Sequence, residues 1–198
     1  DSDKIHPSNR GCEAVYDSNK LIVFGGMDEH FLVKNDLWIY EPSINAWKQM
    51  IADNAQDSPL NRYDTAMVYT GSNVIMFGGE RKDNIHILND TWSYAPNTNV
   101  WTQKTANNSP DAPLARGGHK MVWDGSRVIM FGGYNGVTAT CMNDLWWYDP
   151  AINAWTQKTE NGALGSPVAR SGHEMVWDGT RVIMFGGNDG TLKNDLWW

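Results

Sequence analysis

The chain has only two cysteines among its 198 residues, Cys12 and Cys141. They lie far apart, and their spacing matches no metal-binding motif. Neither a disulfide framework nor a structural zinc site is therefore predicted. The two residues leave the redox compartment open.

Long apolar runs and basic clusters are also missing. No stretch approaches the roughly 20 apolar residues that a membrane-spanning helix needs, and no basic start leads into an apolar segment. We therefore expect no membrane insertion. The net charge is −7 and the few basic residues are spread along the chain, which argues against binding to a nucleic-acid backbone.

Aromatic residues and glycine, in contrast, are abundant. Hydrophobic residues make up 41% of the sequence, which is enough for a buried core and argues against disorder. The 11 Trp and 19 Gly indicate short strands, tight turns and aromatic packing between layers. Strong helix formers never gather in a long run, so an all-β fold is expected.

The sequence is built from four copies of one unit. A Gly-Gly pair that closes an apolar run recurs at offsets of 53, 54 and 54 residues. The four pairs are Gly25-Gly26, Gly78-Gly79, Gly132-Gly133 and Gly186-Gly187. Three other features recur with the same period: an arginine, an Asn-Asp segment and, in the first three copies, a later tryptophan. We place the repeats at about residues 8–50, 60–104, 114–158 and 168–198, within one segment that spans residues 1–198.

Each unit is predicted to form four short strands. In the third copy, residues 119–123 and 127–131 flank Asp124-Gly125, which is a strong signal for an antiparallel hairpin. The second strand is apolar on both faces and must be covered on both sides. The Gly pair at its end allows a bulge or a close backbone approach. A third strand at residues 144–149 and a polar fourth strand complete the unit.

Together these features resemble the Kelch repeat. They are an Arg-x-x-His start, an apolar strand that ends in Gly-Gly, an aromatic third strand, and a Trp about 20 residues after the glycines. The resemblance covers essentially the whole chain and implies an all-β fold, a β-propeller built from Kelch-type four-stranded antiparallel blades. The first copy departs most, with Glu13 where the third and fourth copies carry His119 and His173.

Four blades are fewer than the roughly five to seven of most Kelch propellers. The last copy stops before its Trp-bearing outer strand, so its blade is expected to have three strands. An arc of four blades would leave apolar sheet faces bare, which soluble proteins avoid. We therefore expect further blades from the same chain or from a second copy.

The two faces of such a propeller differ. Because strand direction alternates within a blade, the loops between second and third strands emerge on the same face as the connections between blades. We call this the loop-rich face. It consists of residues 27–34, 51–61, 80–88, 105–115, 134–142, 159–169 and 188–193. Most variation between the copies lies there, so it is the predicted binding face.

Four repeat-matched arginines begin the innermost strands on this face. They are Arg10, Arg62, Arg116 and Arg170. Their guanidinium groups could tie the structure together by bonding backbone carbonyls or the Asp of the next Asn-Asp segment. Alternatively, they could form a ring of donors for an acidic peptide or another carboxylated ligand, as in Kelch domains that recognise acidic motifs.

The histidines do not form a symmetric set. His119 and His173 occupy matched positions, but Glu13 and Thr65 replace them in the other copies, which excludes a ring of four imidazole ligands. We expect both to be structural histidines with satisfied hydrogen bonds.

One loop offers a candidate metal site. Glu80, Asp83 and His86 bring two carboxylates and an imidazole together in the second copy. Kelch-type specifier proteins hold iron with a Glu/Asp/His set, but their ligands are spaced four residues apart and these are three apart. The alternative is a solvated polar loop, and no cofactor is expected.

We interpret the chain as a protein- or peptide-binding module that uses the loop-rich face. The alternative is a propeller-fold enzyme, a sugar-processing or metal-dependent lyase, with its site at the channel mouth, because fold alone does not decide function. No catalytic residues are assigned, since no nucleophile elbow, P-loop or dinucleotide fingerprint is found. The acidic composition leans by association towards a secreted protein.

Overall fold

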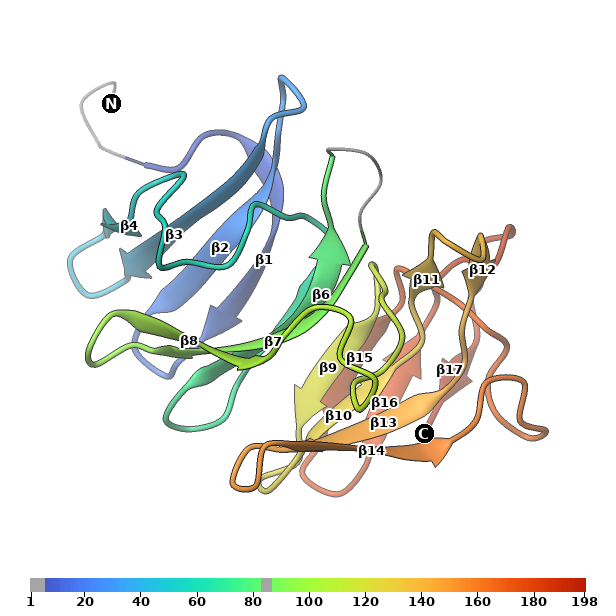
Figure 1. The fold of residues 1–198 in the computed structure, drawn as a ribbon. Helices are drawn as coiled ribbons and strands as arrows, with labels where there is room; N and C mark the ends of the chain where they lie inside the picture. The colour runs from blue at the N-terminus through green and yellow to red at the C-terminus, as the bar shows by residue number, and fades with distance from the viewer. Residues whose placement is uncertain (1–5, 83–86) are drawn as a thin grey trace.

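The computed structural model describes residues 6–82 and 87–198 and shows four antiparallel sheets arranged as a four-blade β-propeller (Figure 1). The predicted all-β propeller fold is confirmed, including a last blade with three strands. No helix that could span a membrane occurs in the described part of the chain.

Within each blade the strands are neighbours in sequence order. The first blade consists of β1 (Arg10–Tyr16), β2 (Leu21–Asp28), β3 (Val33–Glu41) and β4 (Ala46–Ile51). The second consists of β5 (Ala66–Tyr69), β6 (Val74–Glu80), β7 (Ile87–Ala95) and β8 (Val100–Thr105). The third consists of β9 (Lys120–Trp123), β10 (Val128–Phe131), β13 (Leu145–Asp149) and β14 (Ala154–Thr159). The fourth consists of β15 (Glu174–Trp177), β16 (Val182–Phe185) and β17 (Leu196–Trp197).

A small hairpin stands on the loop-rich face of the third blade. It is formed by β11 (Tyr134–Asn135) and β12 (Thr140–Cys141). In Figure 1 this hairpin and the loop between β2 and β3 both point to the upper side of the molecule. The short turns between first and second strands lie at the opposite side.

The Asp-Gly turn of the third blade closes its hairpin as the sequence predicts. The N–H of Asp124 donates to the carbonyl of Arg127 at 3.0 Å, and the Asp124 carboxylate accepts from the N–H of Ser126 at 2.8 Å. Gly125 has a φ of +98°, a backbone conformation that glycine adopts easily and that residues with a Cβ rarely adopt. The turn therefore fixes the register of β9 against β10.

The second strand of each inner blade is covered on both faces. In β6, Val74 and Met76 pack into a cluster with the first blade, while Ile75 and Phe77 pack into a cluster with the third. A further cluster joins the third blade to the fourth, so in the described residues each pair of consecutive blades shares an apolar core. Burial of this strand on both sides is what its unbroken apolar sequence predicted.

The Gly pairs join consecutive blades. Gly132 and Gly133 have φ values of +66° and +103°, and the N–H of Gly133 donates to the carbonyl of Arg170 in the next blade at 2.9 Å. In the first two blades the strand continues past the pair with a shift in register, so the pair bends the strand there rather than ending it.

Candidate functional site

Each repeat-matched arginine is buried inside its own blade. The side chain of Arg116 is fully buried, and Nη1 donates to the carbonyl of Gly132 at 2.9 Å. Its guanidinium group forms a bidentate pair with Asp144, with distances of 2.7 and 2.9 Å. The same carboxylate also accepts from the indole of Trp146 at 2.7 Å. Every charge in this cluster is therefore matched within the blade.

The other three copies repeat this cluster. Each guanidinium group binds the first Gly of the pair and the Asp of the Asn-Asp segment. The sets are Arg10 with Gly25 and Asp36, Arg62 with Gly78 and Asp90, and Arg170 with Gly186 and Asp195. This geometry matches the structural role that we considered for the arginines. Binding of a carboxylated ligand by them stays a prediction.

Three of these arginines also hold the backbone carbonyl of the residue two positions earlier in the chain. Nε of Arg62, Arg116 and Arg170 donates to the carbonyls of Leu60, Leu114 and Val168 at 3.0, 2.9 and 3.0 Å. The side chains of these three residues are 50%, 62% and 54% exposed. We call them the aliphatic set. Arg10 makes the equivalent bond to Ser8, so the first copy contributes no aliphatic side chain.

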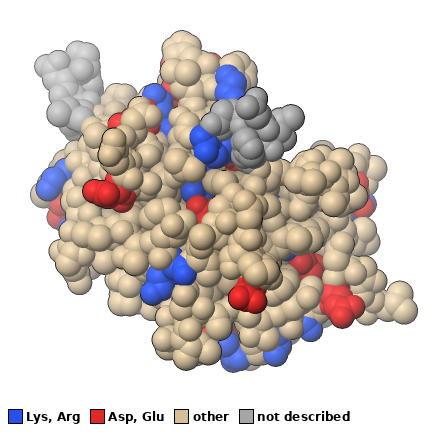
Figure 2. Space-filling view, viewed as in Figure 1, with Lys and Arg blue, Asp and Glu red and all other residues tan. Residues whose placement is uncertain are grey.

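Sequence reasoning missed the aliphatic set. The available signal was an aliphatic residue exactly two positions before the arginine in three of the four copies. The set lies on the loop-rich face, where further exposed apolar side chains accompany it. These are Phe31, Leu32, Val137, Leu164 and Leu192. In the view of Figure 2, charged side chains are scattered and uncharged residues form most of the surface.

A groove lies beside the aliphatic set between the third and fourth blades. Its volume is about 610 Å³, and Val168, Tyr134, Thr140 and Asn188 are among the residues that line it. The thiol of Cys141 also faces this groove and lies 3.5 Å from the carbonyl of Asn188. The groove offers both apolar contacts and hydrogen-bonding groups next to Val168.

Charged groups on the innermost strands are largely paired. Nζ of Lys120 lies 3.2 Å from Oε1 of Glu174 and 3.7 Å from Oε2 of Glu13. These contacts connect strands β1, β9 and β15. Burial raises the pKa of the Glu13 carboxyl, and the nearby ammonium group of Lys120 opposes that shift.

The two matched histidines are buried: His119 and His173 are 1% and 0% exposed. That their hydrogen bonds are satisfied stays a prediction. Each ring lies edge-on to a Phe of the preceding blade, Phe77 or Phe131, with centroids 5.5 Å apart. Burial lowers the pKa of both, that of His173 to about 4.

The candidate metal set is placed only in part. Glu80 accepts a hydrogen bond from the hydroxyl of Tyr63 at 2.9 Å, and burial raises the pKa of Tyr63 to about 12. Asp83 and His86 lie outside the described residues, so metal binding by this set stays a prediction. Within residues 6–82 and 87–198, no three His, Cys, Asp or Glu side chains are grouped as metal ligands.

Comparison with known proteins identifies the family. A family model described as the KLHDC2/KLHL20/DRC7 Kelch-repeats domain matches residues 2–197. The chain belongs to this Kelch-repeat family. The predicted resemblance to Kelch repeats is thereby confirmed.

Several curated proteins are similar to the Kelch chain. It is 25% identical to Kelch domain-containing protein 10 of Rattus norvegicus, over 96% of the chain and 62% of that relative. It is 29% identical to Tip elongation aberrant protein 1 of Schizosaccharomyces pombe, over 90% of the chain and 16% of the relative. The Kelch chain therefore spans less than two thirds of the length of these relatives.

Proposed function

We propose that this Kelch chain is a binding module that holds a protein or peptide partner on its loop-rich face. Kelch propellers commonly act as protein-interaction modules. The aliphatic set, Leu60, Leu114 and Val168, is the observation that carries the proposal. These three exposed apolar side chains occupy matched positions on the loop-rich face, and a buried arginine donates to the backbone carbonyl of each.

The physical basis is burial of apolar surface on a preorganised backbone. Full burial of one aliphatic side chain contributes about 1.5–3 kcal/mol, and apolar residues gathered on a surface mark interaction sites. The bonds from the arginine Nε atoms hold the carbonyls of the set in place before a partner arrives. Binding therefore costs less ordering entropy than it would on a free loop.

This proposal changes the role of the arginines. Binding of an acidic peptide is one of the two roles that the sequence leaves open for the arginines, because guanidinium groups at the surface would attract carboxylates. With each guanidinium group paired to an aspartate, an acidic partner is not required, and an apolar contact carries the recognition. The enzyme alternative is less favoured, since within residues 6–82 and 87–198 no three His, Cys, Asp or Glu side chains are grouped as metal ligands.

Further blades are a second kind of partner that we propose. The face of the fourth blade that points away from the third exposes Val176, Phe185 and Leu196 by more than half. Consecutive blades in this chain bury the equivalent surfaces against one another. A further blade would cover them in the same way.

The test of the binding face compares two sets of surface variants. Leu60→Ser, Leu114→Ser and Val168→Ser are combined in one protein, and Ile44→Ser and Ile152→Ser in a control. Ile44 and Ile152 are 66% and 72% exposed on turns at the opposite face. We expect a partner captured by the unchanged protein to be lost by the first variant and retained by the control. Retention by both variants would contradict the proposal.

A further inference from the structure

Two grooves on the loop-rich face occupy the same place in the repeat. One is the groove between the third and fourth blades that is described above. The other lies between the first and second blades and has a volume of about 480 Å³. Its lining includes residues that correspond, two repeats earlier, to those of the first groove: Phe31 for Ala139, Asn61 for Ala169 and Lys82 for Gly190.

The backbone around both grooves is the same. The N–H groups of Arg62 and Arg170 each donate, at 3.1 Å, to a carbonyl of the preceding blade. Phe31 and Ala139 have φ values of +59° and +52°. The two grooves therefore share one backbone framework and differ in the side chains that line them.

Phe31 is exposed and has an unusual backbone conformation. Among the non-glycine residues of positive φ in the described part of the chain, it is the only aromatic one, and it is 62% exposed. Its N–H donates to the carbonyl of Asp28 at 2.9 Å, and the Asp28 carboxylate accepts from the N–H groups of His30 and Leu32. Bulky residues rarely adopt a positive φ, and such backbone strain is concentrated at functional sites. An exposed ring in this turn adds nothing to the core, which favours a role in binding.

An ammonium group lies beside the ring. Nζ of Lys82, from the second blade, donates to the carbonyl of Phe31 at 2.9 Å and lies 5.6 Å from the ring centroid. Lys34 also lines this groove, whereas the described lining of the equivalent groove contains no lysine. Ammonium groups attract the electron-rich face of an aromatic ring, and aromatic rings pack against one another offset or edge to face. The groove beside Phe31 therefore suits an aromatic side chain.

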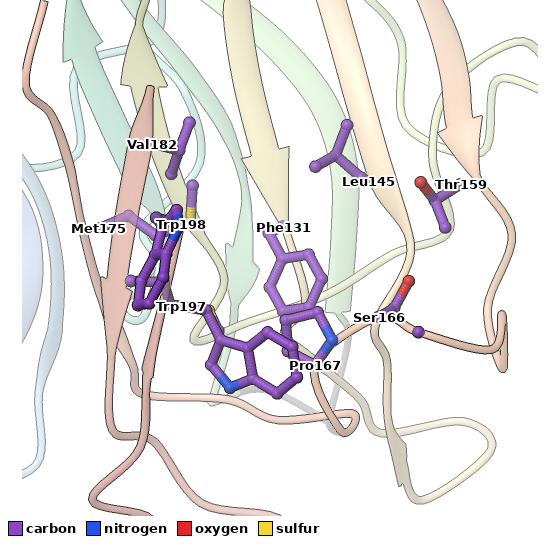
Figure 3. A pocket seen from close by; sticks show the side chains of 11 residues that line it. Phe131, Leu145, Thr159, Ser166, Pro167, Met175, Val182, Trp197 and Trp198 are labelled. Carbon is purple, nitrogen blue, oxygen red and sulfur yellow. The ribbon is translucent and has the colours of Figure 1, made fainter. Parts of the chain in front are cut away.

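The cavity shown in Figure 3 lacks this combination. It lies in the apolar cluster between the third and fourth blades, and no charged side chain is among its described lining residues. Phe131 in that cavity is 5% exposed and belongs to the core. Phe31, in contrast, lies in the loop between β2 and β3, which points to the upper side of the molecule in Figure 1.

We propose that the groove between the first and second blades binds an aromatic side chain on an extended segment of a protein partner, and that Phe31 determines this specificity. The inference rests on the proposed function and identifies the part of the loop-rich face on which recognition depends. The partner's ring packs against Phe31 near the ammonium group of Lys82, in a groove large enough for such a side chain and its backbone. Leu60 of the aliphatic set directly precedes Asn61 and can contact the next residue of the segment.

The test uses a display library of short random peptides and the whole 198-residue protein. We expect the enriched peptides to share an aromatic residue and to bind with one-to-one stoichiometry in calorimetry. Leu in place of that residue should weaken binding roughly tenfold or more, because ring packing and the cation–π contact are lost. Enrichment of peptides without a shared aromatic residue, or no enrichment, would overturn the proposal.

A single variant locates the site. Phe31→Ala should weaken binding of the same peptide roughly tenfold or more. Ala139 has nearly the same φ, so alanine is expected to keep the loop conformation at position 31. Val137→Ala is the control, because Val137 is 84% exposed on the equivalent loop of the third blade, and it should leave binding unchanged. Equal binding by Phe31→Ala and the unchanged protein would overturn the proposal.

The reciprocal transfer tests whether these side chains are sufficient. Ala139→Phe, Thr140→Leu and Ala169→Asn place the side chains of the first groove in the second, on the same backbone framework. We expect a second peptide to bind there, more weakly than the first because no lysine replaces Gly190, so that the stoichiometry rises from one to two. A stoichiometry that stays at one would overturn the assignment of specificity to Phe31.

Partner capture separates this inference from the proposed function. Loss of the partner by the combined Leu60→Ser, Leu114→Ser and Val168→Ser protein, with full retention by Phe31→Ala, would overturn only the inference about the groove. Retention of the partner by both variants would contradict the proposed function as well. Loss of the partner by both variants, with retention by Val137→Ala, is the result that we expect.

Discussion

At the scale of single residues, the buried arginines stabilise the interior of each blade through ion pairs. Arg116 and Asp144 are removed from water, and loss of one partner leaves the other charge buried and unmatched. We therefore expect Arg116→Gln to reduce the free energy of unfolding by about 3 kcal/mol or more in chemical denaturation. Arg181→Gln is the control, because its pair with Asp178 is exposed and should contribute less than about 1 kcal/mol.

The same variant separates the two roles of the arginines. An Arg116→Gln protein of unchanged stability that binds its partner more weakly would support the ligand role instead. An equal loss of stability in Arg116→Gln and Arg181→Gln would contradict the structural account.

Position 133 requires glycine because other atoms of the third blade leave no room for a side chain there. A Cβ there would lie 2.9 Å from Cβ of His119 and 3.0 Å from the carbonyl of Gly117, at a φ of +103°. Gly125 has a similar φ of +98°, but nothing lies within 4 Å of its Cβ position. We expect Gly133→Val to reduce the free energy of unfolding by well over about 1 kcal/mol, and clearly more than Gly125→Val does. Equal losses in thermal denaturation would mean that only the backbone angle matters.

His119 and His173 make the stability of the protein depend on pH. The unfolded chain protonates these imidazoles near pH 6.5, whereas the folded chain does so only at lower pH, near 4 for His173. The unfolded state therefore binds more protons in that interval, and stability falls as the pH drops from 6.5 to 4. For His173 alone the loss is about 3 kcal/mol.

A double variant isolates this effect. His119→Thr with His173→Thr introduces the residue that the second blade carries, since Thr65 donates to the carbonyl of Phe77 in the native protein. Its stability should change less with pH between 6.5 and 4 than that of the unchanged protein. Parallel profiles would show that other groups cause the pH dependence.

At the scale of elements, the fourth strand of one blade is held to the preceding blade by its tryptophan. Trp155 contacts Phe77 and Thr91 of the second blade as well as Tyr148 of its own. Trp47 in β4 makes the matching contact with Tyr40 of its own blade, at 5.1 Å. Trp155 thus differs from Trp47 in its contact with the preceding blade.

We expect Trp155→Ala to cost about 3 kcal/mol in the free energy of unfolding, and Trp47→Ala clearly less. Chemical denaturation of both variants measures the difference. If Trp47→Ala destabilised the protein as much as Trp155→Ala, the contact across the blades would contribute nothing.

The sequence predicted the elements better than the site. A period of about 54 residues, Asp-Gly turns and a strand that is apolar on both faces define the blades, because these patterns follow from local geometry and burial. The pairing of each arginine with Asp is one of the two roles that the sequence leaves open, and it is favoured only by the three-dimensional proximity of positions 25 to 28 residues apart. The burial of both imidazoles against a Phe of the preceding blade could not be predicted, because that contact depends on how neighbouring blades pack.

At the scale of the whole molecule, a rigid stack of blades presents variable loops on one face. The apolar clusters between blades and the arginine clusters within them fix the framework, and the aliphatic set is attached directly to it. Because the strands form the framework and the loops form the exposed face, the repeats agree in the sequence of their strands and differ in that of their loops. We therefore expect a partner to bind on the loop-rich face.

Site-specific photocrosslinking tests which face of the propeller binds the partner. A photoreactive residue is placed in turn at positions 60, 114 and 168 on the loop-rich face, and at positions 44 and 152 on the opposite face. We expect the first three positions to crosslink to the same partner and the last two not to crosslink. Crosslinks from positions 44 and 152, with none from the aliphatic set, would contradict it.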